Sequence, residues 1–333
     1  EIINDRGGFD VIIGNPPYVE ISKVTKRYKL NNYTTIVCGN LYACVYERSE
    51  NISRRNSFVG MIVQLSIVCT DRMSQAQKLL LQRNSWILTF DDRPGKLFDD
   101  LQHIRATIFL STGKEANVFT TKYIRWYTES RSNVFNTLVM TPLNVVNNIN
   151  SIPKIGNEYI RNILDKMLVF KMLSMEYGMS YENQVYVHNA PQYFTRATNF
   201  IPYFWNEVDG EKLSVSLKSY RFCSAKISEI GCCVLNSSIF YLWFIVLSDC
   251  RHLNVREIDN FPIGFEQISE QISAELCRLD KQLMIDYEKY KNRKESSYKS
   301  TGKVVYDEYF PKKSKPIIDE IDKILAVHYG FTE

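Results

Sequence analysis

The stretch Phe9-Asp10-Val11-Ile12-Ile13-Gly14-Asn15-Pro16-Pro17-Tyr18 decides how this chain is interpreted. Four of its first five residues are apolar and either β-branched or aromatic, which predicts a short buried strand over 9–13. Gly14 lets the chain turn at the carboxyl end of that strand, and residues 15–18 follow on a stiff loop. Because ligands of open α/β sheets bind just outside the carboxyl ends of strands, we expect a site on this loop.

The side chains of the loop suit a planar ring that carries an amino group. Asn15 offers an amide oxygen that accepts a hydrogen bond from an exocyclic amine. Pro16 and Pro17 fix their φ angles and have no N–H to repel an amine, and Tyr18 offers an aromatic face. Together the four residues are predicted to hold a heterocycle by its amino group and to stack on its ring.

These residues resemble the catalytic loop of amino-group methyltransferases, and Asn-Pro-Pro-Tyr after an Asp-Val-Ile-Ile strand is most similar to the DNA N6-adenine methyltransferases. The resemblance implies that adenine N6 attacks the methyl group of S-adenosylmethionine (AdoMet) directly. It also implies that the Asn15 side chain and the Pro16 carbonyl accept the two N6 hydrogens, while Tyr18 stacks on a base flipped out of the duplex. Protein-glutamine and ribosomal-RNA guanine methyltransferases use the same loop, so RNA and protein remain less favoured alternatives as substrates.

The composition is that of a globular protein with a sizeable core. The 333 residues are 45% hydrophobic and 23% charged, and this length suggests about two domains. The net charge of +4 is compatible with double-stranded DNA as a partner. The eight cysteines lack the spacing of a zinc site or a disulfide framework, so no metal site is predicted and a reducing cytoplasm is the simplest location. The longest apolar run, Ile239 to Leu247, is too short to span a bilayer, and no membrane association is expected.

In the resembling family the AdoMet site is a Gly-rich turn after the first strand of the sheet, and no such turn is found in this sequence. The 14 glycines are scattered, and only Gly7 and Gly8 are adjacent. The chain also reads as if it were entered in mid-domain, because only eight residues precede the first strand. We therefore expect the main AdoMet motif to come from an upstream methyltransferase segment or from a partner chain.

Basic residues and then a helix follow the predicted catalytic loop. The basic residues either contact DNA phosphates near the catalytic edge or form a solvated face, and both interpretations stay open. They are Lys23, Lys26 and Arg27. Residues 40–48 predict a helix whose start resembles the family helix that begins beside the adenine of the cofactor, and a core helix with an Asn cap is the alternative. The residues at this start are Asn40, Leu41 and Tyr42.

The order of the next elements predicts the fold. Strands over 58–63, 86–90 and 104–110, with a helix over 71–82, resemble the second half of a Rossmann-like methyltransferase sheet, in which the last two strands form an antiparallel hairpin. Phe98 matches the position from which the family supplies a second aromatic ring against the flipped base. Its alternative role is a hydrophobic staple under the loop. We predict an α/β catalytic half of a methyltransferase domain over residues 1–143.

A second domain is predicted over residues 144–264. An Asn-rich linker opens it, and residues 158–176 predict an amphipathic helix. Short strand-like pieces over 185–188 and 203–205 are typical of an α+β module. Residues 231–263, in which Leu-Asn-Ser-Ser opens a helix and Phe-Pro closes the unit, resemble the target-recognition region of large restriction–modification methyltransferases.

Polar residues after that helix carry donors suited to phosphates or base edges, and a plain structural loop is an equally open interpretation. They are Arg251, His252 and Asn254. Residues 265–333 predict a helical carboxyl-terminal segment, with helices over 265–290 and 316–330. Between them, residues 289–303 hold six Lys or Arg and one Glu, which favours a solvated mobile loop over a phosphate contact.

The motifs occur in family order over most of the chain. The resemblance therefore implies site-specific adenine-N6 methylation of DNA with AdoMet in a restriction–modification system, by the carboxyl-terminal part of such an enzyme. The leading alternative is a non-catalytic DNA-binding remnant or specificity subunit that needs a partner chain.

Overall fold

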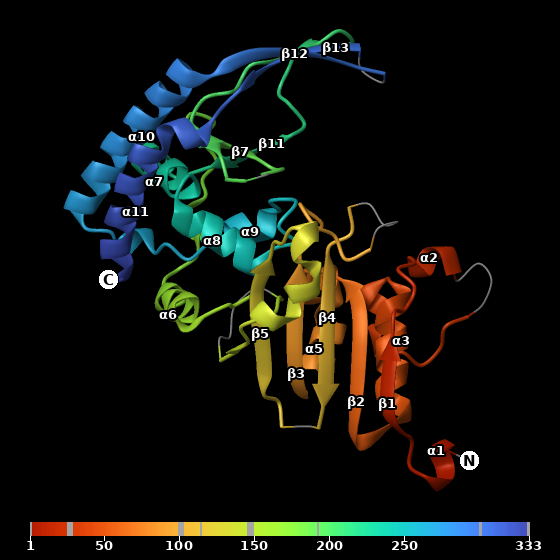
Figure 1. Cartoon of the computed structure of the whole chain (residues 1–333). Coiled ribbons are helices and arrows are strands. Elements are labelled where there is room, and N and C mark those ends of the chain that lie inside the picture. The colour runs from red at the N-terminus through yellow and green to blue at the C-terminus, as the bar shows by residue number, and fades with distance from the viewer. Residues whose placement is uncertain are drawn as a thin grey trace. The chain divides into compact units, whose positions relative to one another are not determined.

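The structure is a computed structural model that describes residues 2–24, 29–98, 103–113, 115–144, 150–191, 193–299 and 302–331 (Figure 1). Its internal contacts divide the chain into two compact units. Unit 1 comprises Glu1–Asp165 and Ile245–Asp249, and unit 2 comprises Lys166–Phe244 and Cys250–Glu333.

Unit 1 is built on a six-stranded mixed sheet with the order β1-β2-β4-β3-β5-β6. β1 runs parallel to β2, β4 lies antiparallel between β2 and β3, and β3 is parallel to β5. The strands are β1 (Phe9–Gly14), β2 (Ser53–Gln64), β3 (Asn84–Phe90), β4 (Ala106–Thr112), β5 (Val118–Ile124) and β6 (Thr141–Pro142). The predicted α/β sheet and its antiparallel hairpin, β3 with β4, are confirmed.

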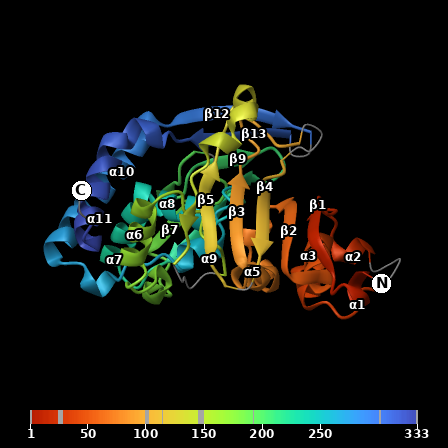
Figure 2. The same ribbon diagram turned by 60° about the horizontal axis from the view of Figure 1, so that its bottom comes forward.

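Helices cover one face of this sheet. α3 (Leu41–Ile52) and α5 (Ser74–Leu81) lie along the same side of the strands (Figure 2). The side chains of Val59, Met61 and Val63 alternate along β2 toward that side and are buried, as period-two patterning requires. The remaining short helices of unit 1 are α1 (Ile2–Asp5), α2 (Ile21–Val24), η1 (Thr34–Cys38), α4 (Ser66–Cys69), η2 (Asp71–Met73), η3 (Thr128–Asn133) and η4 (Phe135–Thr137).

The opposite face is exposed at the β1 end of the sheet, so the prediction of a buried first strand is wrong. Val11 is 55% exposed and Ile13 is 81% exposed. On the same face of the sheet, Val11 lies opposite Phe58 of β2, and Ile13 lies in register with Leu110 of β4 across Gly60. Phe58 is 45% exposed and Leu110 is 39% exposed, so these side chains form an exposed apolar row. Within the described residues β1 pairs only with β2, which leaves its other edge without a ladder. The apolar residues of β1 predicted the strand correctly, but they did not indicate that its side chains are exposed.

Residues 245–249 belong to unit 1, although α8 (Ser238–Leu247), which contains the first of them, begins in unit 2. Lys154 is buried in unit 1, and its backbone N–H donates to the Val246 carbonyl at 3.0 Å. The Lys154 ammonium donates to the Ser248 carbonyl at 2.7 Å, and the Arg105 guanidinium donates to the Asp249 carbonyl at 3.1 Å. Three hydrogen-bond donors within the first 165 residues thus have their acceptors in residues 245–249.

Unit 2 combines two small sheets with a helical layer. One sheet has the order β10-β9-β13-β12 and the other β11-β7-β8. Their strands are β7 (Gln184–His188), β8 (Ala197–Thr198), β9 (Phe204–Asn206), β10 (Gly210–Glu211), β11 (Leu217–Arg221), β12 (Asn292–Tyr298) and β13 (Gly302–Glu308). The helices are η5 (Leu173–Glu176), α7 (Ala225–Leu235), α9 (Val255–Asp259), η6 (Phe265–Gln267), α10 (Glu270–Tyr290), η7 (Pro311–Ser314) and α11 (Lys315–Tyr329).

The helix predicted over 158–176 is shorter than expected. α6 (Glu158–Met167) ends at Met167, and residues beyond it pair with a distant segment. Leu173 donates its backbone N–H to the Phe261 carbonyl at 2.8 Å, and Met172 forms a β-bridge with Pro262. The backbone groups that would have continued the helix are satisfied by this long-range pairing instead.

The basic stretch 289–303 is also different from the predicted mobile loop. Residues 289 and 290 end α10, residues 292–298 form β12 and residues 302 and 303 begin β13; the two strands pair antiparallel from Asn292↔Glu308 to Tyr298↔Gly302. Ion pairs cross the hairpin between Lys294 and Glu308 and between Lys303 and Glu295. Opposite charges on facing strands therefore stabilise a segment whose composition alone resembled a solvated loop.

No single helix of the described residues is long and apolar enough to cross a bilayer. Only α7 and α8 taken together, with a 64° bend between them, reach the required length and composition.

Candidate active site

The loop Asn15–Tyr18 leaves the carboxyl end of β1, as predicted. β1 and β2 are parallel, with Ile13 opposite Gly60 and Gly14 opposite Met61, so their carboxyl ends lie at the same edge of the sheet. Asn15 is exposed at this edge, whereas Pro16 is buried beneath it and Pro17 is exposed. The rigid prolines thus present the Asn15 amide from a fixed support.

Tyr18 is held by its hydroxyl. The phenol donates to the Ile62 carbonyl of β2 at 3.0 Å, and its ring meets the Tyr42 ring edge-on at 6.2 Å between centroids. Burial raises the pKa of Tyr18 to about 12, so the phenol stays protonated and remains a donor at neutral pH. The half-buried ring is therefore fixed in orientation before any ligand arrives.

A second backbone connection brings the start of α3 to the same place. Ile21 donates its N–H to the Gly39 carbonyl at 3.0 Å, and Leu41 donates to the Val19 carbonyl at 2.8 Å. Gly39 has φ = 69°, in the left-handed region where a side chain is disfavoured, and this turn directs the chain into α3. The loop after Tyr18 and the predicted Asn-Leu-Tyr helix start are thereby joined.

Asn40 occupies the N-cap position of α3, but its side chain makes no capping hydrogen bond. Its amide nitrogen lies 3.4 Å from Oε1 of Gln64, at the carboxyl end of β2. Its amide oxygen is buried and has no hydrogen-bond partner among the described residues. A buried acceptor without a donor is costly unless a ligand supplies one, so the site has an acceptor to offer to an amino group.

The other two residues of the helix start are placed differently. Tyr42 is fully buried, and its hydroxyl lies 2.8 Å from the Ser66 hydroxyl, so it supports α3 from inside the core. Leu41 is half-buried. Gln64 was not among the predicted site residues, although its position just after a buried strand is a signal that could have identified it.

Phe98 lies in the loop after β3, whose carboxyl end is at the same edge as those of β1 and β2. The start of this loop is anchored by Asp91, which is bonded to Arg105 at 3.2 Å and to Arg125 at 2.9 Å. Burial alone would raise the pKa of Asp91, but the hydrogen bond from the Tyr123 hydroxyl and the two arginines outweigh this effect. The pKa of Asp91 is lowered overall, and the carboxylate stays ionised. Phe98 itself is half-buried, and no ring contact joins it to Tyr18 in the described part of the chain.

The predicted DNA-binding residues fall into three groups. Lys23 is exposed on α2, whereas Lys26 and Arg27 lie outside the described residues. Arg251 and His252 are exposed in unit 2. Asn254 is the N-cap residue of α9 (Val255–Asp259), where its N–H donates to the Glu257 carboxylate at 2.9 Å and its amide donates to the His252 carbonyl. Asn254 thus has a local structural role that its sequence position did not reveal.

The comparisons with known proteins concern the first part of the chain and its fold. Residues 1–98 match the Eco57I restriction-modification methylase family. A search of proteins of curated function found no match. The matched residues include β1, the Asn15–Tyr18 loop, α3, β2 and the loop that holds Phe98.

One of three similar solved structures shows the fold. The type IIL restriction-modification enzyme MmeI, solved in complex with DNA, aligns with a TM-score of 0.54 at 10% identity over 97% of this chain and 55% of its own. The type ISP enzyme LlaBIII bound to DNA gives 0.39 at 11% identity over 87% and 30%. A modification subunit of a putative type I restriction enzyme from Vibrio vulnificus YJ016 gives 0.29 at 12% identity over 42% and 34%. The chain spans about half the length of MmeI, shares its fold, and matches the Eco57I restriction-modification methylase family over residues 1–98.

Proposed function

We propose that this chain carries the target-base side of a DNA N6-adenine methyltransferase in a restriction–modification system. The observation that carries the proposal is the exposed Asn15 amide at the carboxyl end of β1, within residues that match a restriction-modification methylase family. Adenine is the substrate base because Asn-Pro-Pro-Tyr resembles the loop of the N6-adenine enzymes. DNA is proposed because MmeI, whose fold this chain shares, was solved in complex with DNA.

In this proposal each loop residue acts on the adenine amino group. The Asn15 side-chain oxygen and the Pro16 carbonyl accept the two N6 hydrogens. These hydrogen bonds keep lone-pair density on N6 available for attack on the methyl group. Tyr18 stacks on the base, and its bond to Ile62 fixes the plane of its ring. Phe98 supplies a second aromatic surface, and Lys23 together with Lys26 and Arg27 contacts phosphates. Arg251, His252 and Asn254 contribute to target recognition from unit 2.

AdoMet, when bound, supplies an electrophilic methyl group. Asn40 suits the adenine part of AdoMet. Its buried amide oxygen has no donor in the described structure and can accept a hydrogen bond from the adenine amino group of the cofactor. Leu41 lies at the surface beside it, and the buried Tyr42 supports this helix start from inside the core. The Gly-rich turn that holds the rest of the cofactor in the resembling family is not in this sequence, so we propose that another segment or a partner chain supplies it.

The test combines cofactor binding with product identification. AdoMet is titrated calorimetrically into this chain and into the natural full-length protein, which is then incubated with duplex DNA and methyl-labelled AdoMet. We expect binding only in the full-length protein and N6-methyladenine as the labelled nucleoside by mass spectrometry.

Other outcomes separate the alternatives. DNA binding by the full-length protein with neither AdoMet binding nor methyl transfer would leave the non-catalytic DNA-binding subunit as the better account. Labelled RNA or protein, or a different methylated base, would contradict the proposed substrate. Tight AdoMet binding by the 333-residue chain alone would contradict the proposed second source of the cofactor motif.

A further inference from the structure

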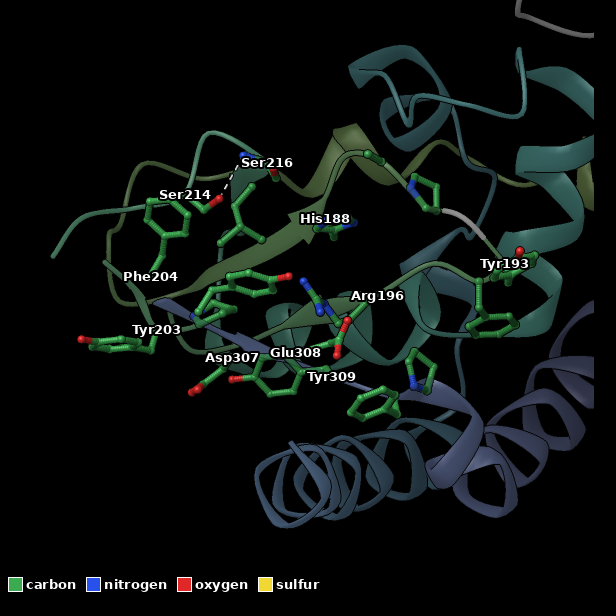
Figure 3. Close-up of a pocket in the computed structure, with 18 of the residues that line it drawn as sticks. His188, Tyr193, Arg196, Tyr203, Phe204, Ser214, Ser216, Asp307, Glu308 and Tyr309 are labelled. Carbon is green, nitrogen blue, oxygen red and sulfur yellow. Dashed lines mark hydrogen bonds between the residues drawn. The ribbon is translucent and has the colours of Figure 1, made fainter. Parts of the chain in front are cut away.

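A cavity of about 850 Å³ lies inside unit 2, far along the sequence from the Asn15 loop. It is bounded by β7, by the segment that follows it up to β9, and by β13 with the residues after it. Figure 3 shows Arg196 at its centre, with the guanidinium directed into the space among His188, Tyr203 and Tyr309. The volume lies within the range of cavities that hold small ligands.

Arg196 has an unusual environment for a cation. It is half-buried, and its guanidinium carbon lies 5.0 Å from the centroid of the Tyr309 ring. Burial lowers the pKa of Arg196, although the guanidinium remains protonated at neutral pH. In the described residues no carboxylate lies within ion-pair distance of it. Five N–H donors in a fixed fork are thus held in a partly dry cavity, where Glu308 lines the same space and raises the pKa of Arg196 from beyond ion-pair distance.

The nearby carboxylates already have other partners. Asp307 pairs with Lys291 at 3.1 Å and with Arg293, and Glu308 pairs with Lys294 at 3.3 Å. Lys312 lines the same cavity and has no ion pair in the described structure. The lining carries Arg196 and Lys312 against Asp307 and Glu308, but only the two carboxylates have ion-pair partners in the described structure, so an anionic ligand can pair with the two cations.

The walls suit a planar aromatic ligand. Tyr203, Phe204 and Tyr306 line one part of the cavity, and the ring of Tyr193 is exposed beside it. Aromatic side chains bind nucleobases by stacking, which tolerates any base because each has a π-face. Burial and the charge of Arg196 lower the pKa of His188 to about 4, so its ring is neutral at pH 7 and offers one donor and one acceptor.

We propose that this cavity binds a single unstacked nucleotide, with its base against the aromatic walls and its phosphate on Arg196 and Lys312. The nucleotide is either a free mononucleotide or one unit of a single-stranded DNA. This nucleotide site goes beyond the methyltransferase activity proposed above, since its residues are separate from the Asn15 loop and its occupancy requires neither AdoMet nor methyl transfer.

The test is calorimetric titration of the 333-residue chain with deoxyadenosine 5′-monophosphate, deoxyadenosine, inorganic phosphate and a ten-nucleotide single-stranded DNA. We expect the monophosphate to bind at least about tenfold more tightly than deoxyadenosine or phosphate alone, because base and phosphate contacts add. Binding of the oligonucleotide at least about tenfold more tightly than the monophosphate supports a unit of single-stranded DNA as the ligand. The reverse order supports a free nucleotide.

Variants locate the site. Arg196→Gln is expected to weaken monophosphate binding at least about tenfold, and Tyr193→Ala several-fold. The matched controls are Arg278→Gln, an exposed arginine of α10, and Tyr159→Ala in α6, whose ring is 79% exposed like that of Tyr193. Asn15→Ala serves as the control for binding at the Asn15 loop, and circular dichroism confirms that each variant is folded.

Two results would overturn the proposal. One is the absence of binding of both the monophosphate and the oligonucleotide at millimolar concentration. The other is binding that Asn15→Ala abolishes and that both Arg196→Gln and Tyr193→Ala leave unchanged, since this would place the nucleotide on the Asn15 loop. Neither result bears on methyl transfer, which is measured separately in the full-length protein.

Discussion

Asn15 is an exposed residue whose side chain makes no hydrogen bond to the described part of the chain. Replacing it by Ala therefore costs little folding free energy, and any loss of activity reports on chemistry. In the full-length protein we expect Asn15→Ala to lower methyl transfer by about 10²-fold or more, the usual effect of removing one polar group that acts in the transition state. DNA affinity, measured by fluorescence anisotropy, is expected to change less than about threefold. Near-normal methyl transfer in this variant would contradict the role of Asn15.

Asp280 gives the clearest pH dependence in unit 2. It is fully buried on α10, with one oxygen accepting from Asn199 at 3.0 Å and the other without a partner in the described structure. Burial raises its pKa to about 7, against the partly opposing bonds from Cys232 and Asn199. A raised pKa means that the folded state favours the protonated acid, so stability is full below about pH 4 and falls as the pH rises to about 7.

We expect Asp280→Asn to remove this slope. The parent should lose on the order of 4 kcal/mol of unfolding free energy between about pH 4 and pH 7 from this group, because one pKa unit corresponds to about 1.4 kcal/mol. The amide keeps an oxygen for Asn199 and carries no charge at any of these pH values. Urea denaturation at several pH values measures the difference between the two proteins. If the unfolding free energies of the parent and the variant changed with pH in parallel, ionisation of Asp280 would not destabilise the folded protein, and the prediction would be contradicted.

At the residue scale, the sequence predicted the positions of candidate site residues that are set by near neighbours in the chain and missed those that are set by distant ones. Asn15 and Tyr18 follow a strand directly, and their placement was predicted from local pattern. Asn40 contacts Gln64, and Arg196 lies beside Tyr309, which are residues far apart in the sequence. No periodicity within a single segment could indicate them.

Among the elements, the junction between α7 and α8 is held by one buried amide. Asn236 accepts hydrogen bonds from the Ala197 N–H at 3.0 Å and from the Tyr287 hydroxyl at 2.8 Å. It donates to the carbonyls of Ala197 and Cys232, both at 2.9 Å. Next to it, the Ser237 hydroxyl caps α8 by accepting from the Phe240 N–H at 3.0 Å. Ser237 is thus the cap of α8, while Asn236 connects α7, β8 and α10.

Replacing Asn236 by Ala is expected to destabilise unit 2 by about 2–4 kcal/mol, because it leaves several buried polar groups without partners. Denaturant unfolding of the full chain measures the change. Asn189→Ala is a matched control, since the Asn189 amide donates a single hydrogen bond to Val215 near the surface. Equal and small effects of the two substitutions would show that the network around Asn236 contributes little.

The predicted elements were most accurate where one segment contains its own signal. The helix over 316–330 is α11, which ends at Gly330 in the left-handed conformation, as a Gly at a helix end indicates. The helix predicted over 158–176 is confirmed up to Met167, and its continuation was wrong because Leu173 pairs with Phe261. The prediction of a loop over 289–303 was wrong because residues 292–298 pair with residues 302–308 in a hairpin. Such partners are chosen by tertiary structure, which can override local propensity.

For the whole molecule, the exposed row on β1, β2 and β4 predicts association. A strand edge without a neighbour, next to apolar side chains, is a template for pairing with another chain. We expect the 333-residue chain to form dimers or larger species at micromolar concentration, and Ile13→Lys to reduce them, because Ile13 is 81% exposed and its replacement removes no core contact. Analytical ultracentrifugation measures this. Val208→Lys, at an exposed valine of unit 2, is the control, and a parent that remains monomeric would contradict the prediction.

The five residues 245–249 also govern how the protein can be taken apart. The chain leaves unit 1 after Asp165, returns for these residues and leaves again, so no single cut yields a complete unit 1. A gene fragment that stops at Asp165 would lack the carbonyls of Val246, Ser248 and Asp249, and the buried ammonium of Lys154 would lose its acceptor. An exchange of the second unit between relatives must therefore carry over, or rebuild, a short passage in the middle of the exchanged segment.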